Sequence, residues 1–328
     1  MNFYIQWDFT NSCNLKCKHC YKNNEIKEYE LEINKCFEIC DIINEMAIKN
    51  NLKISLSITG GEPFSRKEDL FKILNYIDKL KGIKSFQLLS NGLLIEDEDI
   101  EKLTKMKKLN GIQISLESPN KEIHEEIRGK ETFDKTIEII KKLTYNNIKV
   151  HVMMTISKKN INEIIDMYNL LKRLKVFAFG ADRFIPETDD DFDKYVLNKE
   201  EFEKMCQTMF DLSKNDGLPN VRTNRAVYCM IDKNIGGACS AGKYAFAILP
   251  NGDILPCRRL KIKVGNILSE DIIDIWNKSE IMINCRNVQK LEGKCNTCEM
   301  NTRCGGCRAM AFVITRNYLA EDPLCWKE

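Results

Sequence analysis

The chain of 328 residues has a net charge of +2 and is 43% hydrophobic and 30% charged, which is typical of a soluble globular protein with one large domain and a smaller one. It has no apolar run of about 20 residues and no signal peptide at its first residues, so we expect a cytoplasmic protein without a membrane partner. Its lysines are interspersed with acidic residues and form no basic stripe, which disfavours a nucleic-acid partner.

The first 185 residues alternate short apolar runs with amphipathic segments. The apolar runs predict six strands, at residues 3–9, 54–59, 85–90, 111–116, 149–156 and 176–184. The segments between them predict helices, at residues 34–49, 67–80, 97–108, 132–146 and 160–172. Repeated strand–helix units with short connections predict a parallel sheet covered by helices. We therefore expect an α/β fold with a partial (β/α)6 TIM-like barrel, open on one side, in which functional groups follow the strands.

Three cysteines follow the first predicted strand, in the sequence Cys13-Asn-Leu-Lys-Cys17-Lys-His-Cys20. Three thiolates on one loop can hold three irons of a 4Fe–4S cluster, which leaves the fourth iron open to another ligand. A Cys-x2-Cys pair alone could be half of a zinc site, but the full spacing is more specific. The whole chain has fifteen cysteines and three histidines, which also favours thiolate ligands over a histidine-rich metal site.

Polar motifs follow the next three predicted strands. The second strand ends in Thr59-Gly60-Gly61-Glu62-Pro63, the third in Ser90-Asn91-Gly92 and the fourth in Ser115-Leu-Glu117-Ser118, and Arg128 lies farther along. Glycines let the backbone approach a ligand closely, and a guanidinium fork suits a carboxylate. Taken singly, each motif has a structural alternative, because a serine at the end of a strand is often a cap and an arginine is often part of a surface pair.

The cysteine loop and these motifs together resemble the radical S-adenosylmethionine (radical SAM) superfamily. The resemblance implies a cluster on Cys13, Cys17 and Cys20, whose open iron chelates the amino and carboxylate groups of SAM. It also implies SAM contacts from the strand ends: Gly60, Gly61 and Glu62 near the amino group, Ser90 and Asn91 near the ribose or methionine, Ser115 and Glu117 near hydroxyl or amino groups, and Arg128 at the carboxylate.

Residues 186–228 are predicted to connect two domains, 1–185 and 229–328. We expect the acidic run at 188–193 to be a solvated loop and residues 199–214 to form one amphipathic helix. From residue 229 the chain is rich in cysteine and glycine. There, Pro250-Asn251-Gly252-Asp253 between two apolar runs predicts a hairpin, and Ser269 is the predicted N-cap of a helix.

A second set of cysteines lies in this C-terminal part: Cys239, Cys257, Cys295-x2-Cys298-x5-Cys304-x2-Cys307 and Cys325. The pattern resembles the small SPASM domain of radical SAM enzymes, which carries two auxiliary 4Fe–4S clusters, although the family often has three residues between the cysteines at 304 and 307. The resemblance implies one cluster on Cys295, Cys298, Cys304 and Cys325. It implies another on Cys239, Cys257 and Cys307, with Cys229 as the candidate fourth ligand or an open iron in its place. A zinc knuckle is the alternative.

Four cysteines fall outside these sets. Cys36, Cys40 and Cys206 lie on predicted helices and are expected to be buried apolar side chains, while Cys285 is left without a role.

The resemblance covers essentially the whole chain and implies a reaction. An external one-electron donor such as flavodoxin or ferredoxin reduces the cluster, SAM is cleaved to methionine and a 5′-deoxyadenosyl radical, and the radical removes a hydrogen atom from the substrate. Auxiliary clusters can accept an electron, which favours an oxidative outcome. SPASM proteins commonly act on peptides, so we expect a thioether or carbon–carbon cross-link in a ribosomal peptide. A separate recognition protein presents the peptide, or it docks directly in the barrel mouth.

The candidate residues on the substrate side are Tyr21, beside the cysteine loop, and Asp182 and Arg183, after the sixth strand. Arg183 could grip a carboxylate or, equally well, pair with Asp182 or Glu187. Four other functions stay open: a dehydrogenase of a small alcohol or sugar, a protein oxidase of the sulfatase-maturase type, a nucleic-acid-modifying radical SAM enzyme, and a zinc-stapled interaction protein.

Overall fold

A computed structural model describes residues 2–21, 29–187 and 189–327. Its strands are β1 (Asn2–Thr10), β2 (Lys53–Gly60), β3 (Ile83–Ser90), β4 (Leu109–Ser115), β5 (Val150–Ile156), β6 (Ala178–Arg183), β7 (Asn220–Val221), β8 (Ala245–Ile248), β9 (Asp253–Leu255) and β10 (Gly265–Asn266). Its longer helices are α1 (Ile33–Lys49), α2 (Lys67–Ile77), α3 (Asp97–Thr104), α4 (Lys121–Arg128), α5 (Phe133–Tyr145), α6 (Ile164–Arg173), α7 (Asp189–Tyr195), α8 (Lys199–Ser213), α9 (Ile272–Lys278), α10 (Glu280–Arg286), α11 (Lys294–Thr297) and α12 (Arg308–Thr315). Short 3-10 helices are η1 (Pro63–Arg66), η2 (Ile161–Glu163), η3 (Ala226–Met230) and η4 (Val288–Lys290).

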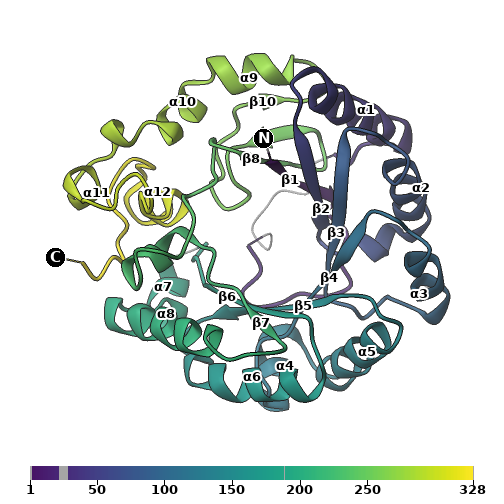
Figure 1. The fold of residues 1–328 in the computed structure, drawn as a ribbon, viewed down its shortest axis with the longest axis horizontal. Helices are drawn as coiled ribbons and strands as arrows, with labels where there is room; N and C mark the ends of the chain where they lie inside the picture. Colours follow the sequence, from purple (N-terminus) through teal and green to yellow (C-terminus); the bar gives the residue numbers. More distant parts are fainter. Residues whose placement is uncertain (1, 22–28, 188, 328) are drawn as a thin grey trace.

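The strands form one sheet in the order β10-β9-β8-β1-β2-β3-β4-β5-β6-β7. In this order, each pair of neighbouring strands between β8 and β7 is parallel. At the other end of the sheet, β9 pairs in antiparallel fashion with both β8 and β10. Figure 1 shows the sheet curving around the centre of the molecule with the helices outside it. The two end strands, β10 and β7, are not hydrogen-bonded to each other. The six predicted strands are therefore confirmed as a partial barrel that is open on one side.

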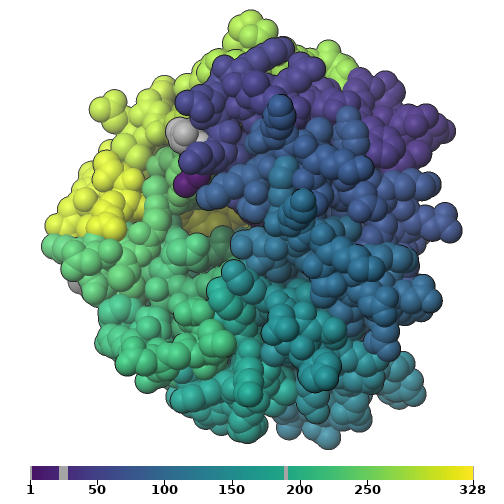
Figure 2. All heavy atoms as spheres, turned by 45° about the vertical axis from the view of Figure 1, so that its right-hand side comes forward, coloured from purple at the N-terminus to yellow at the C-terminus, as the bar shows by residue number. Residues whose placement is uncertain are grey.

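The inner and outer faces of the sheet differ in polarity, because successive side chains of a strand point to opposite faces. On β1, Ile5 and Trp7 are fully buried in the hydrophobic core between the sheet and the helices. The alternate residues are polar, as for Asp8 on β1 and Ser57 on β2, and the Gln87 side chain on β3 donates to the Ser57 hydroxyl (2.6 Å). Figure 2 shows a hollow in one face, between the N-terminal segment and a green segment, with yellow C-terminal residues deep inside. The inner wall is thus suited to a polar ligand.

The C-terminal part of the chain belongs to the same sheet. Strand β8 pairs with the free edge of β1, and the Phe3 ring packs against Phe246 and Trp276 at centroid distances of 5.6 and 5.0 Å. At the other end, β7 from the predicted connector pairs with β6. The hairpin predicted at 250–253 is confirmed by the antiparallel pair β8 and β9, with Gly252 at a φ of 87°. The division of the chain at residues 185 and 229 stays a prediction.

Three local predictions differ from the structure. Residues 189–195 form helix α7 where a loop was expected, since acidic residues in a first turn favour a helix N-terminus; Thr188 lies outside the described residues. Helix α9 is capped by Asp271, whose side chain accepts from the backbone of Ile273 and Asp274, and not by Ser269. Helix α4 was not predicted. Within the described ranges, no helix has the length and apolar character needed to cross a bilayer.

Candidate functional site

The three cysteines of the N-terminal loop lie close together directly after β1. Burial and the neighbouring thiolates of Cys20 and Cys13 raise the pKa of Cys17 to about 11, against the opposing effect of Arg128. Burial also raises the pKa of Cys13, and the charge of Cys20 adds to this effect. Cys17 therefore senses both other cysteines of the loop. The Lys18 backbone N–H donates to the Ile127 carbonyl (2.9 Å), which fixes the loop against helix α4.

The glycine motif after β2 is hydrogen-bonded to the start of this loop. The backbone N–H groups of Gly61 and Glu62 donate to the carbonyls of Thr10 (2.7 Å) and Ser12 (2.8 Å). A Cβ atom at Gly61 would lie 2.3 Å from the Ser12 oxygen, and Gly60 has a φ of +145°. Only glycine allows this approach of the two backbones.

The Glu62 carboxylate is fully buried beside the loop. It accepts hydrogen bonds from the Ser90 hydroxyl (2.7 Å), the Asn91 backbone N–H (2.7 Å) and the Phe64 backbone N–H (3.2 Å). Burial nevertheless raises the pKa of Glu62 to about 6. The structure therefore brings Ser90 and Asn91 together with Glu62, and their direct contact with SAM stays a prediction.

Arg128, at the end of α4, lies between Glu117 and the cysteine loop. Its Nε and Nη2 atoms donate to Glu117 Oε1 at 2.9 and 2.6 Å, and its Nη1 lies 3.9 Å from Cys17 Sγ. Glu117 Oε2 accepts from the Thr155 backbone N–H (2.7 Å), and His19 Nε2 lies 3.3 Å from Oε1. Although burial opposes ionisation, Arg128 and His19 hold the pKa of Glu117 well below its usual value. Glu117 therefore positions Arg128.

The residues around the loop fit a 4Fe–4S cluster with SAM at its open iron. Three thiolates converge on one loop, glycines let the end of β2 approach this loop closely, and a buried carboxylate (Glu62) and a largely buried guanidinium (Arg128) suit the ammonium and carboxylate of an amino acid. Ser115, the last residue of β4, is half-buried two residues before Glu117. Among the described residues, no three His, Cys, Asp or Glu side chains meet as tightly as a single metal ion requires; thiolates bound to separate irons of a cluster stand farther apart.

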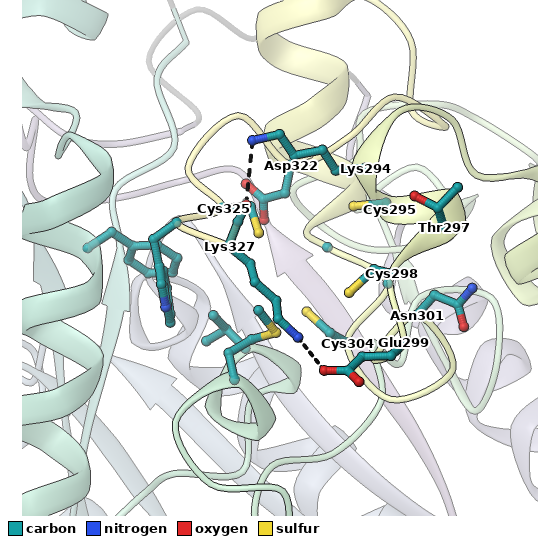
Figure 3. A pocket seen from close by; sticks show the side chains of 16 residues that line it. Lys294, Cys295, Thr297, Cys298, Glu299, Asn301, Cys304, Asp322, Cys325 and Lys327 are labelled. Carbon is teal, nitrogen blue, oxygen red and sulfur yellow. Dashed lines mark hydrogen bonds and ion pairs between the residues drawn. The ribbon is translucent and has the colours of Figure 1, made fainter.

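A second group of four cysteines surrounds a cavity of about 340 Å³ in the C-terminal part, lined by Cys295, Cys298, Cys304 and Cys325. Figure 3 shows their side chains around this cavity. Burial and the thiolates of Cys229 and Cys325 raise the pKa of Cys304 to about 12, despite a backbone hydrogen bond from Gly306. A Cβ atom at Gly306 would lie 3.1 Å from Cys295 Sγ, so the glycine leaves the cavity open. These four are the ones the sequence assigned to one auxiliary cluster, and they fit it.

The third group contains Cys239, Cys257 and Cys307. Burial raises the pKa of Cys239 to about 11, and the Cys307 and Cys257 thiolates add to this effect. Cys229 is different: burial and Cys298 raise the pKa of Cys229, and Cys229 in turn contributes to the raised pKa of Cys304, so it lies beside the other group. Its expected place beside Cys239 does not agree with the structure, because η3 carries it to the other group. Sequence spacing missed Cys285, which lies near Cys239 and Cys257.

The substrate-side candidates lie in two different environments. Arg183 is buried and paired through both Nη atoms with Asp322 in the C-terminal part (3.0 Å for Nη1), with its guanidinium 4.3 Å from the centre of the Phe202 ring. The expected substrate contact of Arg183 therefore does not agree with its position, and neither do its expected partners Asp182 and Glu187. Asp182 instead accepts from Arg225 Nε (3.0 Å) and Nη2 (2.6 Å).

A group of arginines near Asp182 and Tyr21 was not expected from the sequence. Arg259 lies 3.7 Å from Asp182, and the neighbouring Arg258 guanidinium lies 5.3 Å from the centre of the Tyr21 ring. Burial, followed by Arg258 and Arg225, lowers the pKa of Arg259 against the effect of Asp182. One indication of this group was present in the sequence, since Arg258 and Arg259 directly follow the expected cluster ligand Cys257.

Comparisons with known proteins agree with this geometry. Residues 7–171 match the radical SAM superfamily, and residues 239–307 match SPASM, an iron–sulfur cluster-binding domain. An AdoMet-dependent heme synthase of Oleidesulfovibrio alaskensis is 28% identical over 98% of this chain and 86% of its own length. The antilisterial bacteriocin subtilosin biosynthesis protein AlbA of Bacillus subtilis is 28% identical over 94% of this chain and 67% of its own length.

The fold is also found in a solved structure. Streptococcus suis SuiB bound to S-adenosylmethionine has a TM-score of 0.80 to this chain at 20% sequence identity, covering 99% of this chain and 77% of SuiB. Together with the family matches, these observations lead to one conclusion: the chain belongs to the radical SAM superfamily and carries a SPASM iron–sulfur cluster-binding domain.

Proposed function

We propose that this radical SAM enzyme oxidises an anionic substrate that arginines hold inside the partial barrel. As a radical SAM enzyme it uses SAM and a 4Fe–4S cluster, and its SPASM domain binds auxiliary iron–sulfur clusters. When bound, these groups supply a hydrogen-abstracting 5′-deoxyadenosyl radical and an acceptor for the remaining electron. The chain's own residues bind and orient: Glu62 holds the SAM ammonium, Arg128 its carboxylate, and Glu117 keeps Arg128 in place.

The main support for an anionic substrate is the arginine group formed by Arg225, Arg258 and Arg259. Arg225 and Arg259 share the single carboxylate of Asp182, and Arg258 contacts the Tyr21 ring beside the cysteine loop. The side chain of Arg225 keeps 55% of its surface exposed in spite of its ion pair. Guanidinium groups that outnumber their carboxylate partners create a positive potential, and their forked N–H groups suit carboxylates. A substrate bound there would lie next to Tyr21, which directly follows the cluster ligand Cys20.

The first candidate substrate is an acidic peptide that is cross-linked oxidatively through a thioether or a carbon–carbon bond. It is supported by AlbA, which is named for the biosynthesis of a bacteriocin. A peptide could be presented by a separate recognition protein or could enter the barrel mouth directly. Flavodoxin or ferredoxin is the proposed electron donor.

The second candidate is a tetrapyrrole. It is supported by the heme synthase similarity, which extends over 98% of this chain and 86% of that protein. Haem-type rings carry carboxylate side chains, so the same arginine group would suit them. Both candidates therefore share one chemistry, which is recognition of carboxylates by guanidinium groups.

The test is an anaerobic assay of the reconstituted enzyme with dithionite, SAM and either an acidic peptide encoded beside its gene or an iron tetrapyrrole carboxylate. Formation of 5′-deoxyadenosine that rises with one substrate, together with a loss of two hydrogens from a peptide or a mass change in the tetrapyrrole, supports the proposal and selects the candidate. Replacing Arg258 and Arg259 by alanine should raise KM at least about tenfold, since each lost charge-assisted contact is worth about 1.5–3 kcal/mol. The exposed Arg173→Ala variant is the control. Unchanged KM in the arginine variants would refute carboxylate recognition.

A further inference from the structure

Cys285 is packed against the segment that carries Cys239. It lies on α10, is 9% exposed, and a Cβ atom at Gly242, three residues after Cys239, would lie only 2.9 Å from the Cys285 Cβ. Met282, one turn earlier on the same helix, is fully buried and also touches Gly242 through its backbone. The contact with Gly242 thus fixes both the position of the helix and the place of the thiol.

The thiol of Cys285 shares its environment with two expected cluster ligands. After burial, the charges of Cys239 and Cys257 contribute most to raising the pKa of Cys285 to about 12, while Arg308 opposes them. Cys239 in turn senses Cys307 and Cys257. All four cysteines are free and come from four separate segments, and Cys239 lies near each of the other three. Four is the number of thiolates that a 4Fe–4S cluster takes.

A buried cation without a full set of partners lies beside this group. Arg308 is 3% exposed, and its Nε has no hydrogen-bond partner within the described part of the chain. Its Nη1 donates to the carbonyls of Tyr318 (2.9 Å) and Ala320 (2.7 Å), and its Nη2 lies 3.8 Å from Cys295 Sγ. A buried charge needs an anionic partner. A cluster with four thiolate ligands is negatively charged and would meet this need, since Cys239 and Cys285 both sense the charge of Arg308.

We propose that Cys285 is the fourth ligand of the auxiliary cluster on Cys239, Cys257 and Cys307, in the role first given to Cys229. Every iron of that cluster then has a protein thiolate. Such a cluster has no open position for a substrate sulfur, so it serves as an electron carrier. This assignment depends on the SPASM domain and not on the identity of the substrate.

The test counts clusters in protein that lacks the SAM-binding cluster. In a Cys13→Ala/Cys17→Ala/Cys20→Ala background, anaerobically reconstituted protein should hold about eight irons and eight sulfides in two auxiliary clusters. Adding Cys285→Ser should lower the iron towards about four or change the electron paramagnetic resonance and Mössbauer spectra of one cluster. The buried Cys36→Ser, on α1, is the matched control and should change neither.

Double variants identify which cluster is affected. Cys285→Ser combined with Cys257→Ala should lose no more iron than Cys257→Ala alone, whereas the combination with Cys298→Ala should remove nearly all iron. Thermal unfolding checks that each variant folds, and Cys285→Ala is the second variant if serine is not tolerated. A folded Cys285 variant with the iron content and spectra of the background overturns the proposal, as does a selective loss of the same cluster in Cys229→Ser.

Discussion

At the scale of single residues, the Glu117 carboxylate organises three neighbours. It receives two hydrogen bonds from Arg128 and one from the backbone of Thr155, and its Oε1 lies 3.3 Å from His19. A buried pair of charges is held in this way only when its other hydrogen bonds are satisfied. Removal of one partner therefore leaves the other charge buried and unpaired beside the cysteine loop.

We expect Glu117→Gln to destabilise the fold by about 3 kcal/mol, because the Arg128 charge loses its partner. The variant should also bind SAM more weakly, since Arg128 is no longer fixed. Thermal unfolding and calorimetric titration of SAM into the reconstituted protein measure the two effects. The exposed Glu126→Gln on α4, the helix that carries Arg128, is the control, and equal behaviour of the two variants would contradict a positioning role for Glu117.

The proposed pairing of Glu62 with the SAM ammonium should make SAM binding dependent on pH. Burial raises its pKa to about 6, so the carboxyl becomes protonated as the pH falls through that value and can no longer pair with an ammonium. We expect SAM affinity to drop about fourfold between pH 7.5 and 5.5, which is the change in the ionised fraction. Titrations at several pH values check this. In Glu62→Gln the affinity should be low and flat over the same range, and a persistent slope in that variant would assign the effect to another group.

At the scale of elements, the ends of β1 and β2 form one unit with the cysteine loop. Residue Gly61 allows two backbone hydrogen bonds between the strand ends, and a side chain there would collide with the carbonyls of Ser12 and Asn11, at 2.3 and 2.7 Å from the added Cβ. The neighbouring atoms are backbone, so they can move only if the loop itself moves.

We therefore expect Gly61→Ala to displace the cysteine loop. The reconstituted variant should lose about a third of its iron, which is the share of one cluster in three, and should form no 5′-deoxyadenosine. Iron analysis and a SAM cleavage assay measure both. Full iron content with normal cleavage would show that the loop tolerates the side chain.

At the scale of the whole molecule, the C-terminal part is joined to the barrel by a buried ion pair. Arg183 on β6 pairs with Asp322, which also accepts from the Cys307 backbone N–H (2.8 Å). Lys261 adds an exposed connection, since its Nζ donates to the Tyr21 carbonyl (2.6 Å). The cysteine-rich region and the barrel thus hold each other in position.

Asp322→Ala should lower the free energy of unfolding by about 3–5 kcal/mol, because it leaves the Arg183 charge buried without a partner. Urea unfolding followed by circular dichroism measures this loss. The double variant Arg183→Met/Asp322→Leu should recover part of it, since neither charge remains while the Cys307 N–H still loses its acceptor. A loss below about 1 kcal/mol in the single variant would mean that water reaches Arg183.

Local sequence patterns were enough to predict most of the barrel strands and the charged residues around the N-terminal cysteine loop. Alternating apolar residues were sufficient for six strands, and motifs at their ends led to Glu62, Glu117 and Arg128. Helix α4 was missed because only His124 and Ile127 of its residues are buried, so it has a weak apolar stripe. The partner of Arg183 lies 139 residues away. Such pairs, like the choice between Cys229 and Cys285, depend on packing that spacing in the sequence does not encode.

The first strand of the chain lies inside the sheet, between β2 and β8. During synthesis, one of its edges therefore stays unpaired until Ala245–Ile248 has left the ribosome, and an open edge is prone to pair with other chains. Strand β1 gains its second neighbour only when just over three quarters of the protein has been made. Iron delivered before that point would meet a cysteine loop that follows a strand with only one of its two neighbours in place, so we expect cluster insertion after β8 has paired with β1.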